Sequence, residues 1–200
     1  MLYRVSLALA AGLALAAAPA AAQNRFSIDL NAGGAFATDK MAGSDLQDGL
    51  GFGFAGNVRV MPHMHIYAGW DYHRFAAKPL LFGAEDLDDT GYAFGAKFQH
   101  PVWTKVDLWA RAGGLYNHIE LEDDAGDLIA DSGHELGWEA GGGAAFMVTD
   151  RLSIMPGARY RTYSADLTVG ATTVPVDLTY VTAEVMLSWK LGNLGLSARR

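Results

Sequence analysis

Apolar and polar residues alternate along most of the chain after residue 24, and this period-two pattern constrains the fold more than any other feature. Successive side chains of a β-strand point to opposite faces of the sheet, so sustained alternation predicts strands with one apolar face. The pattern recurs in segments separated by stretches rich in turn-forming residues. We therefore predict an all-β chain with eight strands, near residues 25–36, 50–61, 66–75, 90–99, 105–118, 134–148, 151–163 and 176–191.

The first 22 residues differ from the rest of the chain and predict a signal peptide. Arg4 precedes an apolar run from Val5 to Ala18, and Pro19 is followed by three alanines before Gln23. A basic residue, a short apolar segment and a small-residue cleavage site are the parts of a secretory signal. The run is shorter than the ~20 apolar residues that a membrane-spanning helix needs. We expect residues 1–22 to be removed and residues 23–200 to form one domain.

Composition excludes several classes of protein. The chain has no cysteine, which rules out disulfide scaffolds, thiolate metal sites and an amino-terminal lipid anchor on cysteine. Its formal net charge of -7 argues against a nucleic-acid binder, which would carry a basic surface for the phosphates. No motif indicates a cofactor. We expect neither a nucleic-acid partner nor a cofactor.

The two faces of the predicted strands differ in chemistry, and either one could line the interior of a barrel. A soluble ligand-binding barrel would turn its apolar face inward, whereas a barrel in lipid would turn it outward. The charged face is crowded with glycine, which suits a narrow interior, and the apolar face carries aromatic residues near many strand ends. Charges such as Arg111 would each cost about 2–4 kcal/mol near the middle of a bilayer. We predict that the charged face lines the lumen.

Loop lengths indicate which end of the barrel faces the cell surface. Long polar connections at 37–49, 76–89, 119–133 and 164–175 alternate with short turns at 62–65, 100–104 and 149–150. Long external loops and short periplasmic turns are the outer-membrane pattern, and an even number of strands puts both termini on one side. We predict a bacterial outer-membrane location with both termini in the periplasm.

The final predicted strand carries alternating hydrophobic residues that end in an aromatic one, Val181, Ala183, Val185, Leu187 and Trp189. With the eight-strand pattern, this resembles the small outer-membrane β-barrel superfamily that contains the OmpA transmembrane domain, OmpX and the opacity proteins. The resemblance covers residues 23–200 and implies an eight-stranded antiparallel up-and-down transmembrane β-barrel of a Gram-negative bacterium. It also implies recognition of the last strand by the barrel-assembly machinery, although residues 190–200 follow that strand here.

Charged residues on the inward face are nearly balanced in sign, which predicts a structural ion-pair network. Eight strands leave an interior just wide enough for side chains to fill, so a network is favoured over a conduction path. The predicted members are Asp29, Arg59, Asp71, Lys97, Asp107, Arg111, Glu139, Arg159, Arg161 and Glu184. Trp109 also falls on this face, where it would fill volume.

Other candidate sites are weak. His63 and His65 lie in one short turn, but two imidazoles without a nearby carboxylate are too few for a metal site. The acidic segment Glu120 to Asp131 is rich in carboxylates yet lacks the spacing of a calcium loop, which favours a solvated loop. Ser132, His134 and His118 come together near the predicted outer rim without the arrangement of an activated nucleophile. We predict no metal site and no catalytic residues.

These observations lead us to expect a non-enzymatic outer-membrane barrel with a structural body and external loops that carry any recognition. One alternative is passage of small solutes through a hydrated lumen or a lateral opening, and a less favoured one is a lipid A-modifying barrel enzyme. Expected partners are outer-membrane lipid and lipopolysaccharide, the assembly machinery, and an extracellular ligand of unknown identity. We expect a monomer.

Overall fold

The fold is described from a computed structural model in which residues 25–41, 46–76, 84, 86–123, 125, 127–169 and 172–191 are placed. The predicted signal peptide lies outside these residues. The strands are β1 (Phe26–Ala37), β2 (Gly49–Met61), β3 (Met64–Ala76), β4 (Asp86–Trp103), β5 (Val106–Glu122), β6 (Leu128–Asp131), β7 (Glu135–Met147), β8 (Leu152–Val169) and β9 (Thr172–Lys190). In this part of the chain no helix has the length and apolarity to cross a bilayer.

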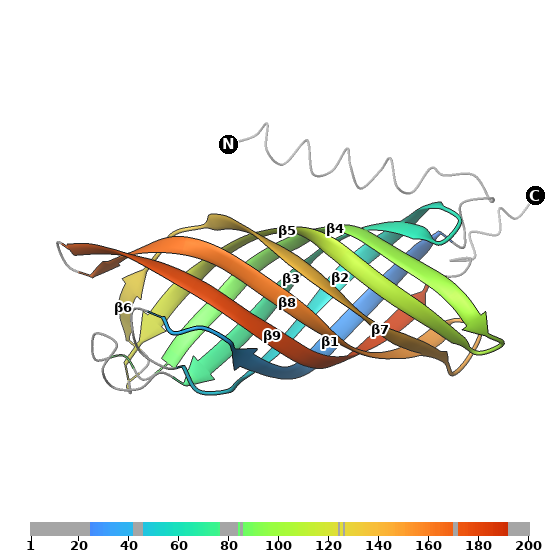
Figure 1. Cartoon of the computed structure of the whole chain (residues 1–200), viewed down its shortest axis with the longest axis horizontal. Coiled ribbons are helices and arrows are strands. Elements are labelled where there is room, and N and C mark those ends of the chain that lie inside the picture. Colours follow the sequence, from blue (N-terminus) through green and yellow to red (C-terminus); the bar gives the residue numbers. More distant parts are fainter. Residues whose placement is uncertain are drawn as a thin grey trace, which may run out of the picture.

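All strand pairs are antiparallel, and the sheet closes on itself because β1 pairs with β9 as well as with β2. The short β6 and the longer β7 both pair with β5 on one side and β8 on the other. They are therefore two parts of one position in the ring, interrupted at residues 132–134. The result is a barrel with eight strand positions (Figure 1), and the predicted fold class is confirmed.

The barrel has two unlike ends. One end, here called the turn end, holds the first residues of β1, the last of β9 and the tight turns at 62–63 and 104–105. At the other end, the loop end, the β8–β9 hairpin projects beyond the remaining strands, and β6 lies beside it (Figure 1). Both described ends of the chain lie at the turn end.

The predicted strands match the observed ones along most of their length, but several predicted loops are wrong in part. The predicted loop 164–175 is mostly a ladder that pairs Ser164 with Asp177 and continues to Val169 and Thr172. β4 begins at Asp86 and β5 extends to Glu122, so the predicted loops 76–89 and 119–133 are shorter than expected. Polar residues led to the loop prediction, yet the ladder continues because inward side chains at this end are apolar and buried.

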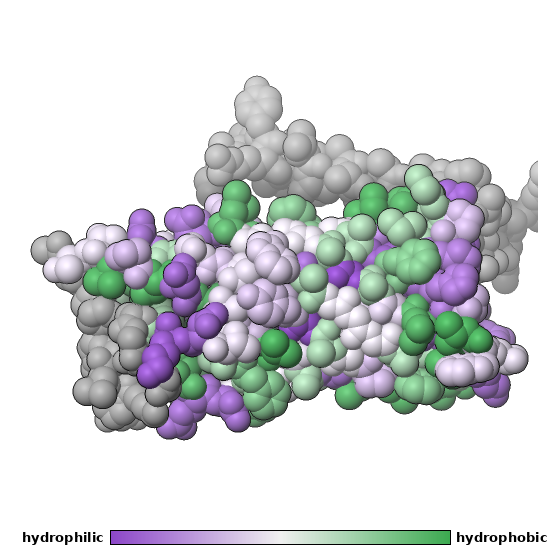
Figure 2. All heavy atoms as spheres, in the orientation of Figure 1, coloured by the Kyte–Doolittle hydropathy of each residue, from purple (hydrophilic) through white to green (hydrophobic). Residues whose placement is uncertain are grey.

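The outer surface of the strands is apolar. Outward residues such as Leu50, Phe54 and Leu108 are each more than half exposed, and no described strand covers them. In Figure 2 the green and pale residues spread over the middle of the barrel, whereas the purple, hydrophilic ones gather mainly toward its two ends. An apolar surface of this extent is costly in water and suits hydrocarbon.

Inward glycines let large side chains cross the narrow lumen. A Cβ atom at Gly113 would collide with the Tyr67 hydroxyl and with backbone of the neighbouring strand, whereas one at the outward Gly56 would meet only the Ala68 carbonyl at 3.9 Å. Trp109 occupies the space beside Gly143 and Gly157. It packs on Met155 and Met186, so the expectation that it fills the lumen agrees with its position.

Candidate functional site

The lumen is the candidate functional site, and its described side chains form three layers. An apolar layer lies at the loop end, an ion-pair network lies in the middle, and a polar cavity opens at the turn end. Inward positions follow the period-two phase, so residues from several strands meet in each layer. The layers are taken in turn from the loop end.

The layer at the loop end, here called the apolar plug, is a cluster of inward hydrophobic side chains. Phe75, Leu87, Ile119, Leu121 and Leu167 are fully buried within it. Leu178 and Tyr180 on β9 complete the contact between opposite walls. Sequence reasoning missed this layer because most of its members fall in segments that were interpreted as loops. Extending the inward phase of β5 from Arg111 by even steps would have placed Ile119 and Leu121 in the lumen.

The middle layer centres on Arg159, whose side chain is fully buried. Its guanidinium Nη2 lies 2.5 Å from Glu184 Oε2 and 3.2 Å from Asp71 Oδ1, and its Nη1 lies 3.3 Å from Glu139 Oε2. Arg161 lies 3.5 Å from carboxylate oxygens of both Asp71 and Glu139. Two arginines thus share three carboxylates contributed by three different strands.

Arg111 and Lys97 complete the ion pairs of this layer. Arg111 donates from Nε to Glu139 Oε1 at 2.8 Å, and its guanidinium carbon lies 4.1 Å from the centre of the Tyr67 ring. Lys97 Nζ lies 2.5 Å from Asp29 Oδ2. Four carboxylates and four cations are therefore paired in a buried interior, where each charge needs its partners because desolvation is expensive.

Eight of the ten residues predicted for the network are joined in this way. The other two, Arg59 and Asp107, are not. Arg59 makes no ion pair with any described residue, and Asp107 accepts a hydrogen bond from Gln99 Nε2 at 2.8 Å. Both lie at the turn end of their strands, beyond the reach of the middle layer, and both line the cavity there. Their membership in the network was therefore a wrong prediction.

A second polar group, centred on Asp89, links the network to the apolar plug and was not predicted. Asp89 is fully buried and accepts hydrogen bonds from the Tyr163 hydroxyl and from Asn117 Nδ2, each at 2.7 Å, and from the Tyr180 hydroxyl. His73 Nδ1 lies 3.2 Å from the Tyr180 hydroxyl and 3.2 Å from Arg161 Nη1, so His73 joins this group to the arginines. Asp89 was assigned to a loop, although it continues the inward phase of Lys97 along β4.

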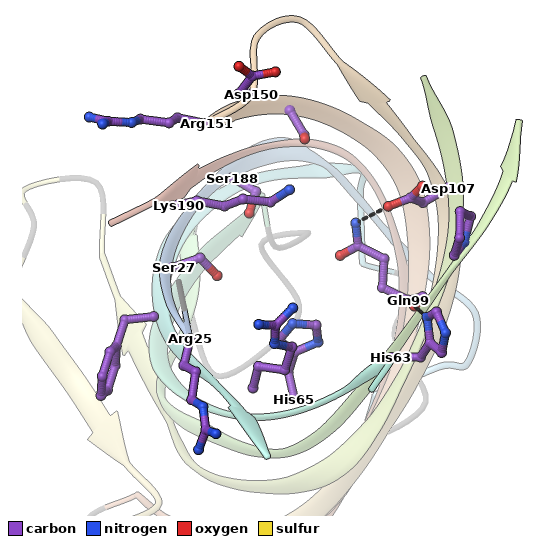
Figure 3. Close-up of a pocket in the computed structure, with 14 residues that line it drawn as sticks. Arg25, Ser27, His63, His65, Gln99, Asp107, Asp150, Arg151, Ser188 and Lys190 are labelled. Atoms are coloured by element: carbon purple, nitrogen blue, oxygen red, sulfur yellow. Dashed lines mark hydrogen bonds between the residues drawn. The ribbon is translucent and has the colours of Figure 1, made fainter. Parts of the chain in front are cut away.

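The layer at the turn end is an open cavity of about 440 Å³, here called the vestibule. It is lined mainly by polar residues from strand ends and turns: Arg25, Phe26, Ser27, Arg59, His63, His65, Gln99, Pro101, Asp107, Asp150, Arg151, Ser153, Ser188 and Lys190. Figure 3 looks into it and shows Ser27, His65, Gln99 and Lys190 on the inner wall, with Asp150 and Arg151 at its edge.

The two histidines that were considered as metal ligands, His63 and His65, do not converge on one point. Both histidines line the vestibule, but His63 adopts the left-handed conformation of the tight turn, and its Nδ1 atom lies 3.0 Å from the Gln99 carbonyl oxygen. The described acidic residues near 120–131 also serve separate roles. Glu122 pairs with Arg74 at 2.7 Å, and Asp123 accepts backbone N–H groups of its own loop. Within the described residues no three potential ligands converge on one point.

His118 and His134 do meet on the outer surface near the loop end. Their Nδ1 and Nε2 atoms lie 3.3 Å apart, and His118 Nε2 lies 3.0 Å from Glu120 Oε1. A hydrolase would need a hydroxyl aligned with such a chain. The Ser132 hydroxyl instead donates to the Gly133 carbonyl and accepts the Ile119 N–H, so it is held by backbone. This arrangement contains no activated nucleophile.

A closed barrel with an apolar exterior and a charged, buried interior is the architecture of proteins that cross a membrane as strands. The model of the outer membrane protein β-barrel domain matches residues 5–190, and the chain belongs to this family. No curated protein sequence is similar enough to count as a relative.

Solved structures support the same fold. Neisserial surface protein A is 16% identical, with a TM-score of 0.63 over 82% of this chain and 96% of that one. OprG from Pseudomonas aeruginosa is 13% identical, with a TM-score of 0.52 over 84% and 98% of the two chains. AlkL, solved in lipid bilayers, is 12% identical, with a TM-score of 0.51 over 85% and 91%. At these identities the likeness shows the fold alone.

Proposed function

We propose that the protein is a structural, non-enzymatic barrel of the bacterial outer membrane that does not conduct solutes through its lumen. The observation that carries the proposal is that two buried layers, the ion-pair network and the apolar plug, follow one another along the lumen. Ions entering from the vestibule would meet the paired charges around Arg159 and then the apolar plug. Passing both would require breaking ion pairs in a low dielectric and wetting an apolar layer, and each step is costly.

We further propose that the turn end faces the periplasm and the loop end faces the outside, since short turns and both described chain ends share one side. The projecting β8–β9 hairpin and the polar surface near Arg74 then form the part that reaches an extracellular ligand. Arg74 is bound by Asp88 and Glu122, which orders this rim. Lipopolysaccharide and the assembly machinery are proposed partners of a barrel that acts as a monomer.

The absence of catalysis is part of the same proposal. It is supported by the backbone contacts of the Ser132 hydroxyl and by the outward position of the His118–His134 pair. The hydroxyls of Tyr180 and Tyr67 lie beside the carboxylates of Asp89 and Glu139, but both tyrosines are buried inside the lumen. The charged groups of the middle layer are engaged by one another, which suits stability rather than chemistry.

Conductance in planar bilayers tests the proposal. We expect purified protein to give no steady channel steps at neutral pH in molar salt, because side chains fill the described lumen in the middle layer and the apolar plug. Proteoliposomes from the same preparation should show heat-dependent gel mobility, which verifies that folded barrel was present. Large, reproducible steps from such folded protein would contradict the proposal and would favour the alternative of a small-solute channel.

A further inference from the structure

The vestibule contains more cationic than anionic side chains. Arg25, Arg59, Arg151 and Lys190 line it, against Asp107 and Asp150. None of these four cations forms an ion pair with a described residue, in contrast to the four paired cations of the middle layer. Asp107 is occupied by its hydrogen bond from Gln99. The cavity is therefore a concave surface with excess positive charge.

One buried polar group without a partner lines the same cavity, and a second lies beside a lining residue. His65 Nδ1 is buried and makes no hydrogen bond, although His65 lines the vestibule. Asn57 is 2% exposed, and both of its amide atoms lack partners. Its cross-strand neighbour Ser27 lines the cavity, so Asn57 lies next to the cavity wall. Buried polar groups are nearly always hydrogen-bonded, and those that are not point to a missing partner.

We propose that the vestibule binds a small anion that carries a phosphate group. Arginine side chains match phosphate oxygens with paired N–H donors, and such charge-assisted bonds are stronger than neutral ones. A volume of about 440 Å³ lies within the range of small-molecule sites. The ligand enters from the turn end, because the middle layer closes the opposite side. Its source is either a soluble phosphate compound or the headgroup of a neighbouring phospholipid.

Two lining residues provide the test variants. Arg59→Gln and Lys190→Gln each remove a cation without leaving a carboxylate unpaired, so both variants should fold as the parent does. Lys105→Gln is the matched control, because Lys105 is an exposed cation at the same end of the barrel that does not line the cavity. Heat-dependent gel mobility verifies the folding of each protein.

Inorganic pyrophosphate is the probe, titrated by calorimetry into protein held in uncharged detergent micelles at low salt. We expect saturable binding that weakens roughly threefold to tenfold in each lining variant and by the product of the two in the double variant. Lys105→Gln should bind as the parent does. Absence of saturable binding at millimolar probe overturns the proposal, as does an equal loss in Lys105→Gln, which would indicate unspecific attraction to a basic end.

The same titration in two kinds of lipid nanodisc separates the sources of the ligand. If the vestibule holds an anionic lipid headgroup, phosphatidylglycerol nanodiscs should lower the affinity for pyrophosphate, relative to phosphatidylcholine nanodiscs, more in the parent than in Arg59→Gln. If the ligand is a soluble anion, the anionic lipid acts only by general repulsion and should change the affinity of both proteins by the same factor. Conductance plays no part in either measurement, so failure of the proposed function would leave this result intact.

Discussion

Replacing Val185 by arginine should lower the free energy of unfolding in lipid vesicles by about 2–4 kcal/mol, because a cation would then face hydrocarbon. Val185 is half exposed on the outer surface of β9, and its neighbour Glu184 belongs to the middle layer inside the barrel. The position therefore lies at the height of the ion pairs, well away from both ends. Reversible denaturant unfolding measures the effect.

Val185→Ile is the matched control and should hardly change the free energy of unfolding, since isoleucine is also apolar and β-branched. The comparison isolates charge from any effect of side-chain size on the ladder. A Val185→Arg variant as stable as the parent in lipid would mean that this face does not meet hydrocarbon. The apolar surface would then need another partner.

Replacing Arg159 by methionine should destabilise the barrel by about 3–5 kcal/mol, the usual cost of removing one partner from a buried ion pair. Glu184 depends most on Arg159, because its other polar contact is the Asn31 amide at 3.5 Å. Asp71 and Glu139 keep Arg161 within 3.5 Å. The loss of stability should therefore come mainly from the Glu184 carboxylate, which would have no ion-pair partner.

A second substitution separates this explanation from simple loss of packing. Arg159→Met combined with Glu184→Gln should recover a substantial part of the lost stability, because the unpaired charge is removed. Lys105→Met changes an exposed cation in a turn, and its free energy of unfolding should lie within about 0.5 kcal/mol of that of the parent. If the double variant were no more stable than Arg159→Met, the charge balance of the middle layer would not be the source of the effect.

The strand positions and the inward face could be predicted because period-two alternation is strict in a barrel between lipid and a narrow lumen. Leu108 and Arg111, for example, differ by three residues and occupy opposite faces as expected. The charged members of the middle layer share one phase of the alternation. The cost of leaving a charge in lipid was enough to place that phase inward.

Partners within the lumen could not be predicted, because they depend on the register and tilt of strands far apart in sequence. Arg159 meets Asp71 across 88 residues, and Lys97 meets Asp29 across 68. Arg59 shows the limit of phase as a guide, since it has the correct face but the wrong height. The apolar plug was missed for a related reason: Leu87 and Leu167 lie among polar residues that are typical of loops, and only the long ladders reveal their burial.

Quenching of single tryptophans by brominated lipid tests the central claim, that the apolar face meets lipid and the polar face fills a closed lumen. Trp189 and Trp138 are half exposed on the outside, whereas Trp109 is 3% exposed and packs on Met186 inside. Met186 lies only three residues from Trp189 along β9. Because Trp109 packs on Met186, the indoles of Trp109 and Trp189 lie at similar depth. Variants that retain one of these tryptophans, with phenylalanine at the other four positions, report each site separately.

We expect strong quenching of Trp189 and Trp138 and little quenching of Trp109 in vesicles whose acyl chains carry bromine. Equal quenching of all three, or quenching of Trp109 alone, would contradict the assignment of the two faces. Absence of quenching at every position in membrane-associated protein would show that the apolar surface does not face lipid at all.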